Sequence, residues 1–280
     1  ILSASFDEDM ITLERASKDG DTYTDVFGKV LCDEASRNPD IVAITAAMAD
    51  GTGLARFARM FPDRFFDVGI AEEHALTFAA GLAAGGLKPV VAVYSSFLQR
   101  AFDQAIHDVC LQNLPVMIAV DRAGLVGSDG GTYQGLFDLS FLNMIPNMTI
   151  LSPKNRWEMA DMVRFCADFQ YPVALRYPRG AAYEGLSAFR TAIVYGKSEI
   201  LYEEEDIAIL AVGSMVKTAE EVRHKLKDMG YNCSLVNARF VKPIDTEIIK
   251  ELSKEHRLLV TMEENVRSGG YGEKVRDFVE

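Results

Sequence analysis

Two neighbouring glutamates mark the most unusual place in the sequence. Glu72 and Glu73 follow the run 65–70, "FFDVGI", and after His74 the segment 75–86 carries no charge, which predicts a helix packed on every side. An ionised carboxylate is costly to bury unless it is paired. Either the two acids favour the dipole of a helix from its first turn, or one of them is kept inside the protein to exchange a proton.

Three other predicted strand ends carry polar, aromatic or cationic side chains. Tyr94 follows the run "PVVAV", the loop 121–135 follows "PVMIAV", and Arg179 ends the segment "RYPRG". The carboxyl ends of parallel strands meet at one edge of a sheet, where ligands of such folds bind. Four such strand ends together favour a functional site that includes Glu72.

Each of these groups also has a purely structural interpretation. His74 and Phe97 could belong to the core, and Asp121 could form a local ion pair with Arg122. The loop glycines Gly127, Gly130, Gly131 and Gly135 could simply be turn residues. This loop, "DRAGLVGSDGGTYQG", lacks the GxxxxGK[ST] pattern and is therefore not a phosphate-binding P-loop.

The elements that must position these groups are short apolar runs alternating with helical patterns. We predict buried strands at 41–45, 89–94, 115–120, 148–151, 172–177, 207–213, 233–239 and 258–262. We predict helices over 75–84, 98–112, 156–168, 217–229 and 245–254. This alternation predicts an α/β fold with two doubly wound parallel-sheet domains.

A change in composition divides the chain, because residues 180–206 hold turn residues and an acidic run. We therefore expect a linker or extension at 1–21, one domain at 22–182 and a second domain at 190–280. The second domain shows three clear strands and stops inside a helix, so we expect it to be incomplete.

Composition and charge narrow the class of protein. The chain has 280 residues, 49% of them hydrophobic, with a net charge of −12 and a pI near 4.9. Such a surface is a poor partner for nucleic acid or anionic membranes, and no apolar run reaches the ~18–20 residues of a membrane span. Lys197, Lys242 and the acidic run 203–205 are interpreted as exposed surface.

Four scattered cysteines, none at a metal-ligand spacing, indicate reduced core thiols in a cytoplasmic protein and no metal site. They are Cys32, Cys110, Cys166 and Cys233. The first ten residues lack the basic region of a signal peptide and an initiator methionine. We therefore expect the chain to be an inner part of a longer protein.

Several long segments resemble the 1-deoxy-D-xylulose-5-phosphate synthases, a thiamine-diphosphate enzyme family related to transketolase. These segments are "DVGIAEEHALTFAAGLA", "YSSFLQRAFDQAIHDV", "DRAGLVGSDGGTYQG", "RYPRG", "ARFVKPID" and "TMEEN". Pyruvate dehydrogenase β chains share "IAE" and "RAFDQ", but the loop 121–135 and "RYPRG" favour the synthases. The resemblance implies a pyrimidine-binding domain at 22–182, followed by a transketolase C-terminal domain.

The resemblance also implies roles at the cofactor. Glu72 would be catalytic, meeting N1′ of the aminopyrimidine ring of thiamine diphosphate and favouring the tautomer that activates the cofactor. This chemistry needs a carboxyl group that can hold a proton near neutral pH, which burial against an apolar helix favours. Phe97 would stack on the ring, with Tyr94, also counted as catalytic, and Arg100 lining the same pocket. Glu73 stands where the family often has glutamine, so its role is uncertain.

At the substrates, the resemblance implies that Arg122 and Arg179 hold the phosphate of glyceraldehyde 3-phosphate. Two guanidinium groups suit a dianion because each donates in a fork geometry. Asp129 would be catalytic and face the group derived from pyruvate. The implied activity is a transferase reaction that joins decarboxylated pyruvate to the aldehyde, an early step of isoprenoid, or terpenoid, and thiamine biosynthesis.

Two departures from the family pattern are visible. Tyr133 stands where the loop of the family usually has histidine, and a phenol does not act as a base at neutral pH. The role of Tyr133 is therefore uncertain, as is that of His74. In addition, no segment resembles the diphosphate-binding domain, which would provide the oxygen ligands for Mg²⁺. We therefore expect this chain alone to be inactive.

Two other functions stay open. The chain could be the second subunit of a split transketolase-like enzyme, or a non-catalytic module that keeps the fold and binds a partner. A buried acid and two anion-binding arginines are unnecessary in a mere scaffold, which favours the enzyme. We expect pyruvate and glyceraldehyde 3-phosphate as small-molecule partners, a homodimer in the cytoplasm, and no nucleic acid or membrane partner.

Overall fold

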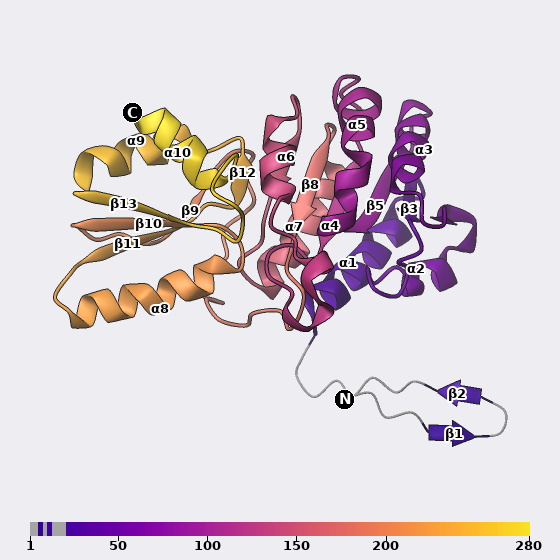
Figure 1. Ribbon diagram of the computed structural model, residues 1–280, viewed down its shortest axis with the longest axis horizontal. Helices are drawn as coiled ribbons and strands as arrows, with labels where there is room; N and C mark the ends of the chain where they lie inside the picture. The colour runs from indigo at the N-terminus through magenta and orange to yellow at the C-terminus, as the bar shows by residue number, and fades with distance from the viewer. Residues whose placement is uncertain (1–4, 8–9, 13–20) are drawn as a thin grey trace.

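A computed structural model describes residues 5–7, 10–12 and 21–280, so the predicted extension 1–21 lies mostly outside the described residues. Two sheets, each with helices on both faces, form two lobes side by side (Figure 1). A separate antiparallel pair, β1 (Ser5–Asp7) and β2 (Met10–Thr12), precedes them in the chain. The predicted α/β class with two sheet domains is confirmed.

Seven strands form the sheet of the larger lobe in the order β12-β7-β8-β6-β5-β3-β4. They are β3 (Ile41–Thr45), β4 (Phe65–Asp67), β5 (Lys88–Tyr94), β6 (Met117–Asp121), β7 (Thr149–Leu151), β8 (Val173–Arg176) and β12 (Phe240–Lys242). All neighbours are parallel except β12, which runs antiparallel to β7. This unpredicted edge strand comes from the C-terminal part of the chain, so both parts of the chain build the larger sheet.

Helices cover both faces of the larger sheet (Figure 1). One face carries α1 (Tyr23–Arg37), α2 (Ala55–Met60) and α7 (Arg156–Asp168), and the other carries α3 (Glu72–Ala84), α4 (Ser95–Leu98), α5 (Phe102–Gln104) and α6 (Asp138–Met144). The helix predicted over 98–112 is irregular, because 99–101 form a 3₁₀ turn and 105–110 a π-helix. At Ala101 the backbone leaves the helical region, with φ −101° and ψ 23°, which interrupts the α-helical hydrogen bonds.

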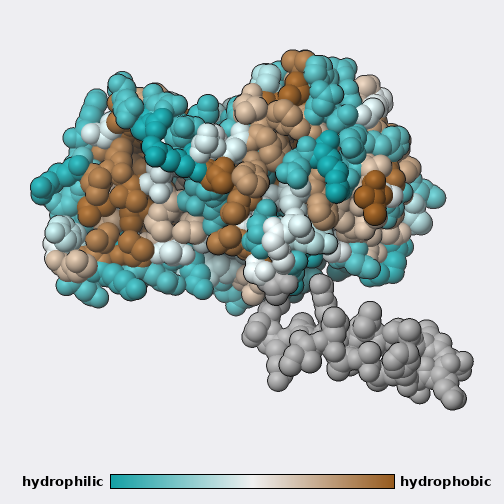
Figure 2. Space-filling view, in the orientation of Figure 1, coloured by the Kyte–Doolittle hydropathy of each residue, from teal (hydrophilic) through white to brown (hydrophobic). Residues whose placement is uncertain are grey.

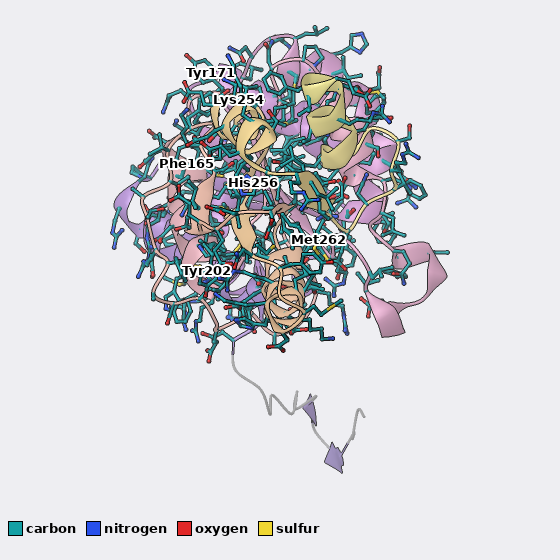
Figure 3. All side chains as sticks on the ribbon, turned by 90° about the vertical axis from the view of Figure 1, so that its left-hand side faces the viewer. Phe165, Tyr171, Tyr202, Lys254, His256 and Met262 are labelled. Carbon is teal, nitrogen blue, oxygen red and sulfur yellow. The ribbon has the colours of Figure 1, made fainter. Side chains whose placement is uncertain are left out.

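The smaller lobe has four strands in the order β13-β10-β11-β9. They are β9 (Glu199–Tyr202), β10 (Ile207–Ala211), β11 (Cys233–Asn237) and β13 (Leu258–Met262), with helices α8 (Met215–Asp228), α9 (Thr246–Glu255) and α10 (Tyr271–Val279). β9 was not predicted and runs antiparallel to β11, while the other pairs are parallel. Figure 3, which views the molecule from this lobe, labels Tyr202 of β9, His256 just after α9 and Met262 of β13.

β13 forms an open edge of the smaller sheet, because within the described residues it pairs with β10 alone. Leu258 is 53% exposed, and residues 259–262 are half-buried. Figure 2 shows hydrophobic residues gathered over this part of the lobe. An apolar strand with an unpaired side is a template for pairing with another chain.

A cluster of buried charges joins the two lobes. Lys154 and Glu158 come from the larger lobe, while Glu199 and Arg239 come from the C-terminal part of the chain, and none is more than 4% exposed. The ammonium of Lys154 lies 2.6 Å from Glu199 Oε2 and 3.1 Å from Glu158 Oε1. The guanidinium of Arg239 lies 2.7 Å from Glu158 Oε1 and 2.9 Å from Glu199 Oε1. Every charge therefore has two partners of opposite sign.

Lys242 and the acidic run 203–205 were predicted to be exposed, which holds for Glu203 and Glu205 but not for Lys242 and Glu204. Lys242 is half-buried and donates hydrogen bonds to the carbonyl oxygens of Asn143 (2.9 Å) and Ile145. Burial lowers the pKa of the Lys242 ammonium. Glu204 is also half-buried and accepts from Arg223 at 2.7 Å, so single-residue charge is a poor guide to exposure in this part of the chain.

All four cysteines are free and buried, as predicted for core thiols. Over the described residues, no helix combines the length and the apolar character that crossing a membrane requires.

Candidate active site

Glu72 begins α3, directly after β4 and a short turn. Its side chain is 3% exposed, and Oε1 accepts a hydrogen bond from Arg100 Nη1 at 2.8 Å. The other oxygen, Oε2, is buried and has no hydrogen-bond partner among the residues that the structure describes. Burying a polar atom without a partner is unfavourable, so this oxygen is free to bind a ligand that can share a proton with it.

The prediction that α3 is packed on every side is wrong. One face, which includes Ala75, Leu76 and Ala79, is buried against the larger sheet, but Glu73 and His74 are exposed at the start of the opposite face. The core interpretation of His74 is therefore also wrong. Alanine and glycine do not indicate which side of a helix is buried, because they are found both in cores and at close helix contacts. Glu73 and His74 thus face away from Glu72.

Three aromatic side chains form a wall that Arg100 links to the Glu72 carboxylate. Tyr94 ends β5 and Phe97 lies in α4, with their ring centroids 5.6 Å apart. Tyr133, from the loop after β6, lies edge-on to Phe97 at 5.3 Å and 6.3 Å from Tyr94. The guanidinium of Arg100 lies 5.2 Å from the centre of the Phe97 ring, and its side chain is about half exposed. Acid, cation and aromatic surface therefore lie together, as an aromatic nitrogen heterocycle would need.

Arg122 and Arg179 converge on one carboxylate. Arg122 Nε lies 3.1 Å and Arg179 Nε 2.9 Å from Asp129 Oδ2. Arg122 also donates to the carbonyl of Gly51 at 2.8 Å and lies 3.7 Å above the ring of Tyr94. From the sequence, the Gly51 carbonyl had not been predicted as a partner of Arg122. The three charged groups that were assigned to the substrates thus form one connected group with a net positive charge.

The conformation of this corner depends on residues that leave little freedom. Arg122 itself has a positive φ of 57°, an uncommon conformation for a residue with a side chain. A Cβ at Gly51 would lie 1.7 Å from the hydroxyl oxygen of Tyr94, so only glycine lets this backbone approach the ring. The positions of both the arginine and the aromatic wall are therefore fixed by close packing.

Asp121 lies behind the arginines at the end of β6 and is fully buried. Its Oδ2 accepts a hydrogen bond from Thr24 Oγ1 at 2.8 Å, and the expected ion pair with Arg122 is present, 3.5 Å from Oδ1 to Nη1. Burial raises the pKa of Asp121 to about 7, although Thr24 and Arg122 act in the opposite direction. Burial also raises the pKa of the Tyr94 phenol, whose ring lies against the guanidinium of Arg122. The Asp121 carboxyl therefore titrates closer to neutral pH than an ordinary aspartate, while the Tyr94 phenol stays protonated there.

The structure brings eight of the predicted site residues into one connected group. They are Glu72, Tyr94, Phe97, Arg100, Arg122, Asp129, Tyr133 and Arg179. Glu73 and His74 stay outside it, and His74 instead lines an open hollow with Asp67 and Phe78. The chemical roles assigned to these residues stay predictions.

Sequence reasoning missed one residue of the smaller lobe that contacts the loop carrying two members of this group. Glu264, in the segment "TMEEN" after β13, touches the base of the loop that carries Asp129 and Tyr133. The signal was available, because "TMEEN" also follows a strand end. The sequence alone could not tell which strand ends of the two sheets face each other.

The site has features of a cofactor pocket but no cluster of metal ligands among the described residues. The orphaned Glu72 Oε2, on a carboxylate that Arg100 links to the ring of Phe97, fits the aminopyrimidine end of thiamine diphosphate. Within residues 21–280 and the two short strands, no group of three or more His, Cys, Asp or Glu side chains could hold a metal ion.

Two family profiles match the chain. The transketolase pyrimidine-binding domain matches residues 20–184, and the transketolase C-terminal domain matches residues 196–280. The larger lobe and the smaller lobe follow these two matches, apart from β12, which crosses to the larger sheet.

Curated relatives at high identity are 1-deoxy-D-xylulose-5-phosphate synthases. The protein of Lachnoclostridium phytofermentans is 58% identical over 258 residues, which cover 92% of this chain and 41% of that protein. The protein of Caldanaerobacter subterraneus subsp. tengcongensis is 54% identical over 259 residues, which cover 92% of this chain and 42% of that protein. The chain thus spans about two-fifths of the length of these relatives.

Solved structures of similar fold are transketolases. One described as split gene transketolase, inactive beta4 tetramer, has a TM-score of 0.85 at 31% identity and covers 93% of this chain and 85% of that chain. The transketolase of Campylobacter jejuni has a TM-score of 0.75 at 19% identity, with 91% of this chain and 44% of that chain covered. The second likeness shows the fold alone.

Proposed function

We propose that this chain, which belongs to the transketolase family, supplies the pyrimidine-binding and C-terminal portions of a 1-deoxy-D-xylulose-5-phosphate synthase. The proposed reaction joins pyruvate, with loss of carbon dioxide, to glyceraldehyde 3-phosphate in isoprenoid biosynthesis. The observation that carries the proposal is the buried Glu72. Arg100 holds one of its oxygens and also packs on the ring of Phe97, while the other oxygen is unpartnered among the described residues. The identity of 54–58% to synthases supports the choice of reaction.

Thiamine diphosphate, when bound, supplies the carbon nucleophile of this reaction. Glu72 would hold the proton that the aminopyrimidine ring shares, at the oxygen that has no protein partner. Phe97 and Tyr94 would hold the ring by stacking and exclude water from the carboxylate. The guanidinium of Arg100 would hold Glu72 Oε1. This would leave Oε2 as the oxygen that shares the proton with the aminopyrimidine ring.

Arg122 and Arg179 would bind the phosphate of the aldehyde. In the structure both contact Asp129, which neutralises only one of the two positive charges. A phosphate dianion would restore the balance of charge and accept hydrogen bonds from both guanidinium groups. Asp129 would then be free to turn toward the reacting carbon atoms, and Tyr133, at the edge of the same pocket, would donate a hydrogen bond.

A second candidate is the β subunit of a split transketolase. It is favoured by the similarity to the split-gene structure, of which this chain covers 85%, against 41% of a synthase relative. The two candidates differ in the donor substrate. Product formation from pyruvate supports the synthase, whereas transfer of a two-carbon ketol group from a ketose phosphate supports transketolase.

We further propose that the chain acts in the cytoplasm as a homodimer and is inactive without a diphosphate-binding portion. The four free thiols support a reducing compartment. The exposed Ile70 (81%), together with Phe66 and Phe78 along the hollow beside α3, supports a further contact surface. The description of the split-gene tetramer as inactive supports the loss of activity. Calorimetry of the 280-residue chain with thiamine diphosphate and Mg²⁺ tests this point, and micromolar binding with turnover of pyruvate would contradict it.

The decisive experiment compares two neighbouring glutamates. In the assembled enzyme, in which this chain is joined to a diphosphate-binding portion, we expect Glu72→Gln to lower pyruvate turnover at least ~100-fold, the lower range for a positioned acid or base. The exposed Glu73→Gln is the matched control and should keep near-normal turnover. Near-normal turnover of Glu72→Gln at saturating cofactor would sink the assignment.

A further inference from the structure

The loop 124–135, which carries Asp129 and Tyr133, is closed at its base. Gly124 and Gly135 exchange two backbone hydrogen bonds of 2.8 Å, forming an isolated antiparallel bridge. Residues between them have little regular structure, only two short 3₁₀ turns. The position of the loop therefore depends strongly on what holds its base.

Glu264 of the smaller lobe lies directly against this base. Its Oε1 accepts a hydrogen bond from the backbone amide of Leu125 at 3.4 Å, and its Oε2 accepts from Ser214 Oγ at 2.5 Å. A Cβ at Gly124 would lie 2.8 Å from the carboxyl carbon of Glu264, so the carboxylate fills the space under the first residue of the loop. Ser214 lies just before α8, so the smaller lobe orients this carboxylate.

The backbone of the same segment holds the other side of the loop. The carbonyl of Glu264 accepts a hydrogen bond of 2.5 Å from Arg176 Nη2. Arg176 is almost fully buried, and its Nε donates to Asp138 at 2.7 Å. The amide of Val266 donates to the carbonyl of Leu136 at 3.0 Å. Glu264 and Val266 of the smaller lobe thus hold the chain at the two ends of the loop.

We propose that Glu264 is a positioning residue through which the smaller lobe sets the geometry of the phosphate-binding end of the site. Glu264 contacts the loop and not the site residues themselves, so it acts through the backbone that carries Asp129 and Tyr133. The inference rests on the proposed function for its consequence in substrate binding, but the contact can be tested without any activity.

The first test measures amide hydrogen exchange in the 280-residue chain. We expect Glu264→Ala to speed exchange of residues 125–134 by about 5- to 30-fold, as expected when hydrogen bonds to a charged group are lost. Glu264→Gln keeps an acceptor of the same shape and should retain most of the protection. The exposed Glu221→Gln, on α8 of the same lobe, is the matched control and should leave the loop unchanged.

Two results of this test would overturn the inference. One is unchanged exchange of residues 125–134 in Glu264→Ala. The other is an equal loss of protection across α8, α9 and the loop, since Glu264 would then support the whole lobe and not the loop. Ser214→Ala, which removes the group that orients the carboxylate, gives a milder second variant with the same expected pattern.

The second test measures steady-state kinetics in the assembled enzyme. We expect Glu264→Ala to raise KM for the phosphorylated aldehyde about 5- to 30-fold, with KM for pyruvate unchanged and Glu264→Gln restoring most of the affinity. An equal rise in both KM values would overturn the inference. If the unmodified assembled enzyme shows no turnover, the proposed function fails, while the exchange test still decides the role of Glu264.

Discussion

Among the buried charges of the described residues, those at the contact between the two lobes differ from those at the candidate active site. In the interlobe cluster of Lys154, Glu158, Glu199 and Arg239, each charge has two partners of opposite sign. Burial alone would raise the pKa of Glu199, but the hydrogen bond and charge of Lys154 and the charge of Arg239 lower it. This cluster is therefore satisfied by the protein itself.

At the candidate active site, buried acids are left partly unsatisfied. Glu72 and Asp121 each keep one carboxylate oxygen with no hydrogen-bond partner in the described part of the chain. Burial raises the pKa of Asp121, the opposite of the direction at Glu199. The comparison shows that the environment of a buried carboxylate separates a structural role from a chemical one. Full pairing favours stability, and incomplete pairing leaves capacity for a ligand or a proton.

The largest effect should come from breaking the satisfied cluster. We expect Lys154→Met to lower the free energy of unfolding by about 3–5 kcal/mol, because it leaves Glu158 and Glu199 buried with one partner fewer. The measurement is urea unfolding followed by circular dichroism. Lys227→Met, which breaks an ion pair of a 54% exposed lysine, is the control and should cost at most ~1 kcal/mol. Equal effects of the two variants would remove the distinction between the cluster and the surface.

The next effect concerns pH and Asp121. The folded state holds the Asp121 proton up to about pH 7, whereas the unfolded chain releases it near pH 4. The folded state therefore binds more protons between these values, and stability falls as the pH rises through this window. Between pH 5 and pH 8, this fall in the free energy of unfolding should amount to about 3 kcal/mol. We expect it to be absent in Asp121→Asn, as measured by unfolding at pH 5, 6, 7 and 8. The exposed Asp228→Asn should leave the pH profile as it is, and an unchanged profile in Asp121→Asn would refute the assignment.

A third prediction separates binding from stability at the arginines. Truncation of Arg122 or Arg179 to alanine should weaken binding of the phosphorylated aldehyde by roughly 1.5–3 kcal/mol, the range for hydrogen bonds to charged groups. Affinity for pyruvate should change little, as measured by the two KM values in the assembled enzyme. The half-exposed Arg190, paired with Asp161, provides the control truncation. If both substrates weaken equally, the arginines are structural, like the interlobe cluster.

The smallest effect is expected at Tyr133. Tyr133→His should change the acceptor step by less than about tenfold, since it exchanges one ring against Phe97 for another of smaller area. Pyruvate decarboxylation should change less than the acceptor step. Separate measurement of carbon dioxide release and of product formation tests this order, and identical acceptor kinetics would show the position to be neutral.

Much of the fold and the site could be predicted, because both depend on local patterns. The runs 41–45 and 258–262 are strands with the predicted bounds, since short apolar β-branched segments read as buried strands. Glu72 and Arg179 meet in one group because strand order places the carboxyl ends of parallel strands together. The rule that the carboxyl ends of parallel strands meet at one edge of a sheet was enough to predict this grouping, without any interatomic distance.

The parts that could not be predicted depend on long-range pairing. Lys154 and Glu199 lie 45 residues apart, and nothing in either neighbourhood distinguishes them from surface charges. The three-residue strand β12 has too few residues to show a pattern, and its partner β7 is far away in the sequence. The exposed face of α3 was misjudged because alanine gives no sign of which side is covered.

The pairing of β12 with the larger sheet has a consequence for folding during synthesis on the ribosome. The larger lobe has all of its other strands once β8 has left the ribosome at Arg176, but the edge at β7 stays open until Lys242 has emerged. At about 5–20 residues per second, that interval lasts several seconds. During it, a nascent chain exposes unpaired backbone to its neighbours on the same messenger, and a truncated chain that ends before residue 240 keeps that exposed edge permanently.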